Sequence, residues 1–189
     1  MSSTEKMPEV LARRPQRADA RRNFEMLLVA ARTAFDENGS TTSLEDIARR
    51  AGVGIGTLYR HFPTRQDLFE SVYVAEVEAL CRSAEDFAEL SPWEALAAWL
   101  ERFVRYVVTK RAIAEELVQG SDLYPSCRGA IDTAGAPMLR RAQEAGAARA
   151  DVSFDDVLRL VGGITMFKDA APGQIERVLG MALDGIRVR

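Results

Sequence analysis

Histidine and cysteine are almost missing from this chain of 189 residues. It contains one histidine, His61, and two cysteines, Cys81 and Cys127, which do not form a CxxC pair. A single histidine cannot build a histidine metal site. It also leaves no second histidine for a Ser/His/Asp triad if His61 has another role. Two isolated cysteines are usually buried small hydrophobes in a reducing compartment, and the alternative is a cross-link between them. We therefore expect no metal and no cofactor.

Long apolar runs are also missing. No stretch approaches the roughly 20 apolar residues needed to span a bilayer, and the first residues lack the apolar core of a signal peptide. The chain has no strand pattern, no internal repeat and no low-complexity tract. These absences predict a helical protein of the cytoplasm with no membrane partner.

Positive charge is scarce overall but concentrated in one region. The net charge is −3, with a sequence pI near 5.4. Between Arg13 and Arg65, however, the chain has ten arginines, six acids and no lysine, a local balance of +4 that leaves −7 elsewhere. Groove binding to nucleic acid requires positive charge locally, so the uneven distribution keeps that class of function open.

The segment from Ser43 to Phe62 reads as two short helices joined by a glycine turn. Thr42 or Ser43 is the expected N-cap of the first helix, and Asp46 three residues after Ser43 completes a capping-box pattern. Gly52 can take the left-handed conformation that ends a helix. One face of the first helix is apolar at helical spacing: Leu44, Ile47, Ala48 and Ala51.

The second helix of this segment separates into an inner and an outer face. Turning about 100° per residue places Ile55, Leu58 and Phe62 on the inner side. The outer side has Gly56, Thr57, Arg60 and His61, with Tyr59 at its flank. Their small, hydroxyl and cationic side chains suit the edges and phosphates of a DNA groove. The alternative is a helical corner whose polar outer face is merely solvated.

The residues AGVGIGTLYRHFPTRQDLF, preceded by a capped short helix, closely resemble the N-terminal signature of the TetR family of bacterial transcriptional regulators, over roughly residues 21–75. The resemblance implies an all-helical homodimer that binds operator DNA through its N-terminal helices and a small effector through its C-terminal helices. It also implies a phosphate contact at Arg65, a cation whose place in the first turn of a helix needs an outside anion to make sense. The candidate DNA contacts are Thr42, Ser43, Gly54, Ile55, Gly56, Thr57, Tyr59, Arg60, His61 and Arg65.

The expected organisation has three parts and about nine helices. A mobile basic arm (1–20) precedes a helix-turn-helix domain (21–66) and an effector-binding and dimerisation domain (67–189). The arm is either solvated or tracks phosphates beside the operator. In the last domain we expect a separate helix over 110–119, a loop over 121–126, and a helix to about Ala148 that Pro137 kinks or splits. A cap at 151–153 and Pro172 should begin the final two helices.

Aromatic and sulfur side chains gather in the C-terminal half. They are either plain core or the lining of a mostly apolar cavity for a small, mostly apolar effector. Arg102, one position before Phe103, either meets an acidic group of that ligand or pairs with Glu101 or Glu116. The candidate effector residues are Trp99, Arg102, Phe103, Tyr106, Tyr124, Met138 and Met166.

Several glycines lie in the last two predicted helices. Because glycine lowers helix propensity by ~1 kcal/mol relative to alanine, their presence indicates close packing, either within one chain or across a two-fold axis. The resemblance implies a four-helix dimer interface here. Its candidate residues are Leu160, Val161, Gly162, Thr165, Val178, Met181, Ala182 and Gly185.

Three classes of function fit these features to different degrees. An enzyme is disfavoured because the sequence has no triad, no phosphate loop and no carboxylate pair set by spacing. A helical interaction module without DNA binding fits the helices but not the outer face of 55–62. The favoured function is a DNA-binding transcriptional regulator, a repressor released by its effector.

Overall fold

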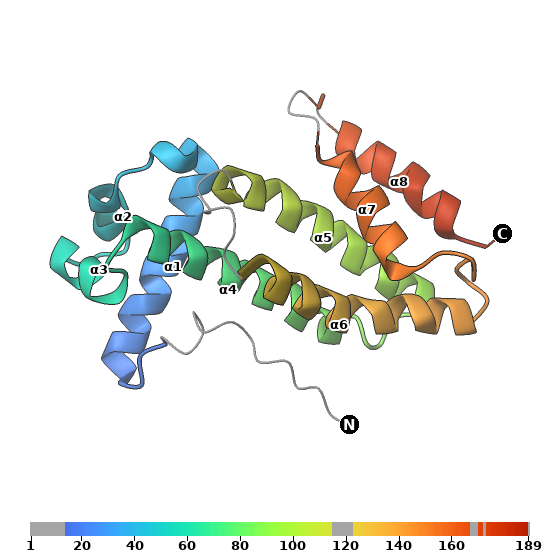
Figure 1. Ribbon diagram of the computed structural model, residues 1–189, viewed down its shortest axis with the longest axis horizontal. Helices are drawn as coiled ribbons and strands as arrows, with labels where there is room; N and C mark the ends of the chain where they lie inside the picture. Colours follow the sequence, from blue (N-terminus) through green and yellow to red (C-terminus); the bar gives the residue numbers. More distant parts are fainter. Residues whose placement is uncertain (1–13, 115–122, 167–169, 172, 189) are drawn as a thin grey trace. The chain divides into compact units, whose positions relative to one another are not determined.

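The computed structural model describes residues 14–114, 123–166, 170–171 and 173–188, and these residues form an all-α fold (Figure 1). The predicted fold class is therefore confirmed, with eight α-helices and one short 3₁₀ helix in the described residues rather than about nine helices. Their bounds are α1 (Ala18–Asn38), η2 (Gly39–Thr41), α2 (Leu44–Arg50), α3 (Ile55–His61), α4 (Arg65–Asp86), α5 (Pro92–Ala114), α6 (Leu123–Glu144), α7 (Phe154–Ile164) and α8 (Gln174–Ile186).

The described residues belong to two compact units. The first unit comprises residues up to Val77 and those within Thr109–Arg128; the second comprises Glu78–Val108 and Gly129–Arg189. Helix α4 runs unbroken across the boundary between Val77 and Glu78. Helices α5 and α6 also cross between the units, after Val108 and after Arg128, so three of the described helices contribute to both.

The first unit is a three-helix arrangement of α1, α2 and α3 completed by the start of α4. Gly39, at φ +61°, ends α1 in the way the Asn38-Gly39 pair predicts. Phe35 of α1 stacks on Phe69 of α4, with ring centroids 4.4 Å apart and planes 15° from parallel. Both rings are fully buried, so this aromatic pair is the centre of the unit's core.

A capping box fixes the start of α4. The Thr64 hydroxyl accepts the Asp67 backbone N–H at 3.1 Å, and the Asp67 carboxylate accepts the Thr64 backbone N–H at 3.0 Å. These bonds satisfy amides that have no partner inside the first turn. The predicted cap at Thr64 is confirmed, and it sets Arg65 as the first residue of the helix.

The core of the second unit is built around Trp99 of α5. Its ring is fully buried, and its Nε1–H donates to the Leu80 carbonyl oxygen at 3.2 Å. Helix α6 approaches this ring directly at Gly135, where an added Cβ would lie 2.7 Å from the Trp99 ring and would also overlap Phe154. Glycine is therefore required at this contact between α5, α6 and α7.

Two predictions about the helices after α4 need correction. Helix α5 continues without a break through Lys110 to Ala114, so no new helix begins at residue 110; the rest of that predicted helix lies outside the described residues. The predicted loop at 121–126 is already helical from Leu123. Thr109 could cap a new helix at residue 110, but no glycine or proline breaks the chain there, so α5 continues.

Pro137 lies inside α6, which stays one helix from Leu123 to Glu144 rather than splitting. The predicted cap at Ser153 is confirmed, because Ser153 and Asp156 form a complete capping box at the start of α7. Helix α8 begins at Gln174, after a left-handed Gly173, two residues later than predicted.

Neither cysteine is in a disulfide. Cys81 is partly buried and Cys127 is buried, and both are free thiols, as expected for cysteines used as small hydrophobes. Burial, with the nearby Glu78 carboxylate, raises the pKa of the Cys81 thiol to about 11. The Cys81 thiol is thus protonated and unreactive at neutral pH.

Candidate nucleic-acid interface

The turn between α2 and α3 has the geometry that its glycines predict. Gly52 takes φ +69°, and the Val53 N–H donates to the Ala48 carbonyl at 3.0 Å. Gly54 then caps α3, accepting the Thr57 N–H at 2.8 Å. This turn directs α3 away from α2 at a fixed angle, as a helix-turn-helix requires.

Helix α3 is held by a small aromatic cluster against α1. Leu58 and Phe62 are fully buried, and the Phe62 ring lies 5.0 Å from the Phe24 ring of α1. His61 also contacts Phe24, edge to face, at 5.9 Å. One side of the short helix is therefore anchored, which leaves the other side to solvent.

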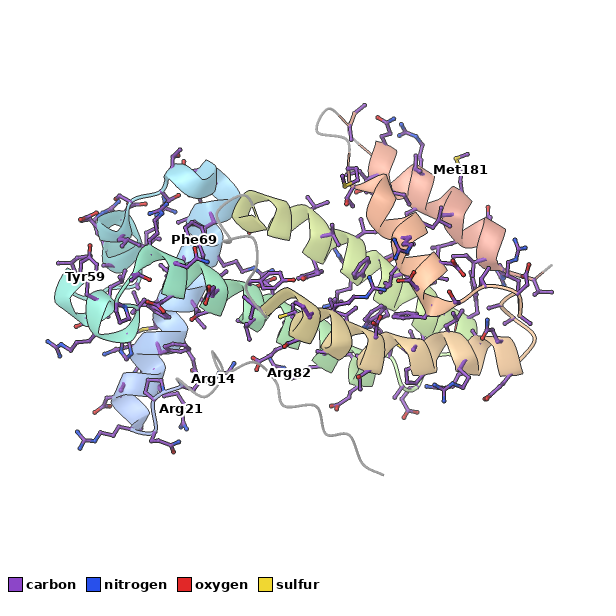
Figure 2. All side chains as sticks on the ribbon, viewed as in Figure 1. Arg14, Arg21, Tyr59, Phe69, Arg82 and Met181 are labelled. Atoms are coloured by element: carbon purple, nitrogen blue, oxygen red, sulfur yellow. The ribbon has the colours of Figure 1, made fainter. Side chains whose placement is uncertain are left out.

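The free side of α3 has the residue types predicted for DNA contact. Gly56 and Arg60 are exposed, Thr57 is half-buried, and Tyr59, labelled in Figure 2, is 46% exposed. Ile55 was predicted to pack inward, and this was wrong: it is 37% exposed at the start of the helix. The outer face therefore begins with an apolar side chain that can meet a thymine methyl group.

His61 is less exposed than its predicted place on the outer face suggests. Burial lowers the pKa of its imidazole, and the positive charge of Arg60 lowers it further. At neutral pH the ring is therefore neutral, and it offers one N–H donor rather than a positive charge.

Thr42 and Ser43 have different environments although they are adjacent. Thr42 is 4% exposed, and its hydroxyl donates to the Ala34 carbonyl at 2.9 Å. Its side chain faces the interior and is not placed to meet DNA. Ser43 is exposed and caps α2 by accepting the Asp46 N–H at 3.1 Å. The Asp46 carboxylate accepts from Arg50 Nε at 2.6 Å.

Arg65 has an internal partner that the sequence did not predict. Its guanidinium donates to the Thr42 carbonyl oxygen at 2.7 Å and lies over the Phe69 ring, 5.0 Å from the centroid. The expectation that this cation needs an outside anion is therefore wrong, because backbone and ring already accommodate it. The phosphate contact itself stays a prediction.

Exposed arginines surround the N-terminal end of α1. Arg17, Arg21 and Arg22 are exposed on the first turns of the helix, and Figure 2 labels Arg21 there. This is the end of α1 that carries Phe24 and therefore contacts α3. The local positive charge found in the sequence thus lies on the same unit as α3.

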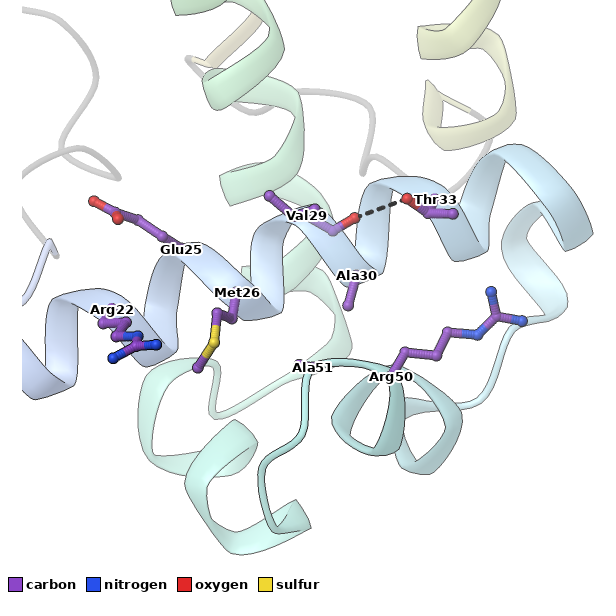
Figure 3. Close-up of a pocket in the computed structure, with 8 residues that line it drawn as sticks. All are labelled: Arg22, Glu25, Met26, Val29, Ala30, Thr33, Arg50 and Ala51. Carbon is purple, nitrogen blue, oxygen red and sulfur yellow. Dashed lines mark hydrogen bonds between the residues drawn. The ribbon is translucent and has the colours of Figure 1, made fainter.

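A groove is lined by residues of α1 and of the end of α2 (Figure 3). It has a volume of about 570 Å³ and shares no residue with the predicted DNA contacts. Its Arg50 is held by Glu37 and Asp46, each at 2.6 Å. The lining residues are Arg22, Glu25, Met26, Val29, Ala30, Thr33, Arg50 and Ala51.

The predicted effector residues on α5 come together in the second unit. The rings of Trp99, Phe103 and Tyr106 follow one another with centroids 6.0 Å apart at each step, and all three are buried. Met138 of α6 is also buried. Their burial is what we expect if these residues simply form the hydrophobic core. An effector that binds here would have to enter between these rings.

The remaining predicted effector residues are placed differently. Arg102 is half-buried and lies 3.6 Å from Asp86, a partner that was not among those anticipated. Met166 is 72% exposed. The side chain of Tyr124 lies outside the described residues.

The predicted dimer residues divide into a buried and an exposed set. Val161 and Thr165 are buried within the chain. Leu160 of α7 and Val178 and Met181 of α8 are exposed, Met181 by 72%. Gly162 and Ala182 are half-buried and Gly185 is exposed.

The glycines of α7 and α8 differ in what surrounds them. An added Cβ at Gly163, Gly180 or Gly185 would meet nothing within 4 Å among the described residues. At Gly162 it would lie 4.0 Å from the Phe103 ring, which is ordinary contact. Close packing among the described residues therefore does not account for these glycines.

Comparison with known proteins decides the family. Residues 27–72 match the description "Bacterial regulatory proteins, tetR family", and residues 91–188 match "Transcriptional regulator SbtR-like, C-terminal domain". The chain belongs to the TetR family. It is a helix-turn-helix DNA-binding transcriptional regulator, and members of this family are regulators rather than enzymes.

Solved TetR-family structures match nearly the whole chain. The TetR regulator SCO0520 of Streptomyces coelicolor is 41% identical over 86% of this chain and 97% of its own, with a TM-score of 0.75. A TetR regulator of Mycobacterium vanbaalenii is 35% identical over 92% of this chain and 100% of its own, also with a TM-score of 0.75.

A curated relative gives a shorter match. The HTH-type transcriptional regulator SAR0097 of Staphylococcus aureus is 35% identical over 83 residues, 42% of this chain and 44% of that protein. The chain thus spans less than half the length of this relative. In the described residues, no group of three or more potential metal ligands occurs, and no helix is long and apolar enough to cross a membrane.

Proposed function

We propose that this TetR-family chain is a cytoplasmic repressor that binds a palindromic operator as a homodimer. In each subunit α3 enters the major groove, and the two copies read half-sites about 34–36 Å apart. A small, mostly apolar effector bound in the C-terminal helices releases the DNA by favouring a conformation that no longer fits the operator.

The observation that carries this proposal is the two-sided character of α3. Leu58 and Phe62 anchor one side, while Tyr59 and Arg60 remain exposed on the other. A solvated corner needs neither a glycine at position 56 nor a cation and a phenol beside each other. We propose a contact set made from the exposed or half-buried residues: Ser43, Gly54, Ile55, Gly56, Thr57, Tyr59, Arg60 and His61.

The proposed effector site rests on the aromatic row of α5. Buried rings of Trp99, Phe103 and Tyr106 suit an apolar ligand, and Arg102 of the same helix pairs with Asp86 at the end of α4. The proposed dimer contact is the exposed apolar face of α7 and α8, formed by Leu160, Val178 and Met181. Two copies of such a face would form the isologous interface of a two-fold dimer.

The DNA-binding proposal is tested with a Tyr59→Phe/Arg60→Ala double variant. A duplex selected by the wild-type protein from a random-sequence pool serves as the operator. We expect the double variant to lose at least about tenfold in affinity, since hydrogen bonds to charged groups contribute about 1.5–3 kcal/mol each. Titration followed by fluorescence anisotropy measures the loss.

Arg82→Ala is the matched control. Arg82 is also an exposed arginine, on α4 in the second unit, and its substitution removes the same charge. It should bind the selected duplex like the wild type. Unchanged binding by the Tyr59/Arg60 variant would refute the assignment of α3 as the reading helix.

A further inference from the structure

Arg65 completes a ring of contacts that connects the start of α2 to α1 and to α4. Its guanidinium bonds the Thr42 carbonyl at 2.7 Å and covers Phe69 at 5.0 Å. Phe69, labelled in Figure 2, stacks on Phe35 at 4.4 Å. Thr42 in turn donates its hydroxyl to Ala34, the residue before Phe35, at 2.9 Å. The ring therefore joins α1, the start of α2 and the first turn of α4.

Thr42 is the residue in this ring whose position matters for DNA. It immediately precedes Ser43, the N-cap of α2, whose hydroxyl accepts the Asp46 N–H. Its buried hydroxyl fixes it to α1, and its carbonyl fixes it to Arg65. The direction in which α2 leaves α1 is thus set by these two bonds, and α3 follows α2 through a turn of four residues, Ala51 to Gly54.

The chemistry of Arg65 suits this task better than lysine would. A planar guanidinium can donate in its plane while its face lies on an aromatic ring, whereas an ammonium is a compact, strongly hydrated point charge. The side chain is half-buried, which strengthens both contacts. The capping box of Thr64 and Asp67 fixes the backbone from which it projects.

We propose that Arg65 is a positioning residue that orients the helix-turn-helix on α4, rather than a phosphate ligand. Movement of α4 then carries Thr42, and with it α2 and α3, through the bond from the guanidinium to the Thr42 carbonyl. This inference rests on the proposed operator binding and assigns Arg65 a role different from the one implied by family resemblance.

Two variants separate positioning from phosphate contact. Arg65→Met keeps an apolar stem over Phe69 but removes the donor and the charge, and Arg65→Lys keeps the charge but loses the planar fork. If Arg65 positions α2, both variants lose about tenfold or more in affinity for the selected duplex. Their affinity for a scrambled duplex changes little, so the ratio of specific to non-specific binding falls.

The salt dependence of binding provides the decisive measurement. A phosphate ligand contributes about 0.9 per subunit to the slope of log affinity against log salt, so its loss in Arg65→Met would reduce the slope. A positioning residue leaves the slope at the wild-type value. A reduced slope for Arg65→Met, together with near-normal binding by Arg65→Lys, would overturn the proposal.

Hydrogen exchange of the DNA-free protein tests the same link independently. Either variant should increase amide exchange in α2 (Leu44–Arg50) while the far half of α4 keeps its protection. Unchanged exchange in α2 would count against the link even if DNA affinity fell. If the wild-type protein selected no duplex at all, the proposed function would fail. The exchange experiment needs no DNA, so it would still show whether the Thr42–Arg65 bond stabilises α2.

Discussion

Gly135 is the residue at which the fold leaves least room for a side chain. A Cβ there would overlap Phe154 and lie 2.7 Å from the Trp99 ring, and Trp99 is itself fixed by its bond to the Leu80 carbonyl. Neither ring can move without disturbing the core of the second unit. The sequence shows a glycine in a helix, but not that two rings lie against it.

A Gly135→Ala substitution should therefore destabilise the protein in spite of the higher helix propensity of alanine. Overpacking of this kind costs about 1–3 kcal/mol, against a propensity gain of ~1 kcal/mol. Urea unfolding followed by circular dichroism gives the change in free energy of unfolding. Gly56→Ala, where the added Cβ meets nothing within 4 Å among the described residues, is the control and should unfold at or above the wild-type midpoint.

Helical periodicity predicts the environment of some side chains of α3 and α5 but not of others. The 100° rotation of a helix correctly placed Leu58 and Phe62 inside and Arg60 outside, whereas Tyr59, predicted at the flank, is exposed. It misplaced Ile55, because periodicity gives the side of a helix but not how far a neighbouring helix covers that side. The contact between Arg102 and Asp86 joins two helices and has no signal in local spacing.

At the scale of single elements, capping residues determine how well a helix start can be predicted. Helices α2, α4 and α7 begin where Ser43, Thr64 and Ser153 indicate. Thr109 precedes position 110 as a possible cap, but α5 continues through it. Caps are local hydrogen-bond chemistry and can be read from sequence, whereas the persistence of a helix through Pro137 depends on packing.

The capping box of α7 makes a testable contribution to stability. Ser153→Ala should lower the free energy of unfolding by about 1 kcal/mol at neutral pH, because an N-terminal amide loses its acceptor. Hydrogen bonds from the Ser153 hydroxyl and backbone hold the pKa of Asp156 below its usual value. The stabilisation is present above the unfolded-state pKa and is lost as the pH falls through the lower folded-state value.

The difference in stability between wild type and Ser153→Ala should accordingly narrow in acid. Urea unfolding at pH 7 and near pH 3 measures it. Ser153→Asn, which retains a good N-cap, should stay near the wild type at neutral pH. A difference that is the same at both pH values would show that the Asp156 carboxylate plays no part in the cap.

At the scale of the whole molecule, the proposed two-fold assembly depends on α7 and α8. Met181→Asp places a charge in the centre of the apolar face and should convert dimers to monomers, since an unpaired charge is costly to bury. Light scattering after gel filtration measures the mass. Val29→Asp, an equally drastic change at an exposed valine of α1, should remain dimeric.

Operator affinity should fall together with dimerisation in Met181→Asp, because a single α3 reads only one half-site. A variant that remained dimeric would move the proposed interface away from α8. The family and the all-α class were readable from the sequence, since both rest on residues 43–62 and on helical periodicity. Which residues of α7 and α8 are buried and which are exposed could not be predicted, because the neighbours of each face come from distant parts of the chain.

Helix α3 has seven residues, and no side chain of its own caps it. Isolated helices shorter than about 12–15 residues are marginal in water. Helix α3 is therefore stabilised by the burial of its Leu58 and by the contact of Phe62 with Phe24 of α1. A synthetic peptide of residues 43–62 would for this reason be a random coil with no preference among duplexes. Transfer of the DNA sequence specificity to another protein scaffold would therefore require the hydrophobic residues of α1 that pack on α3 as well as the exposed residues of α3.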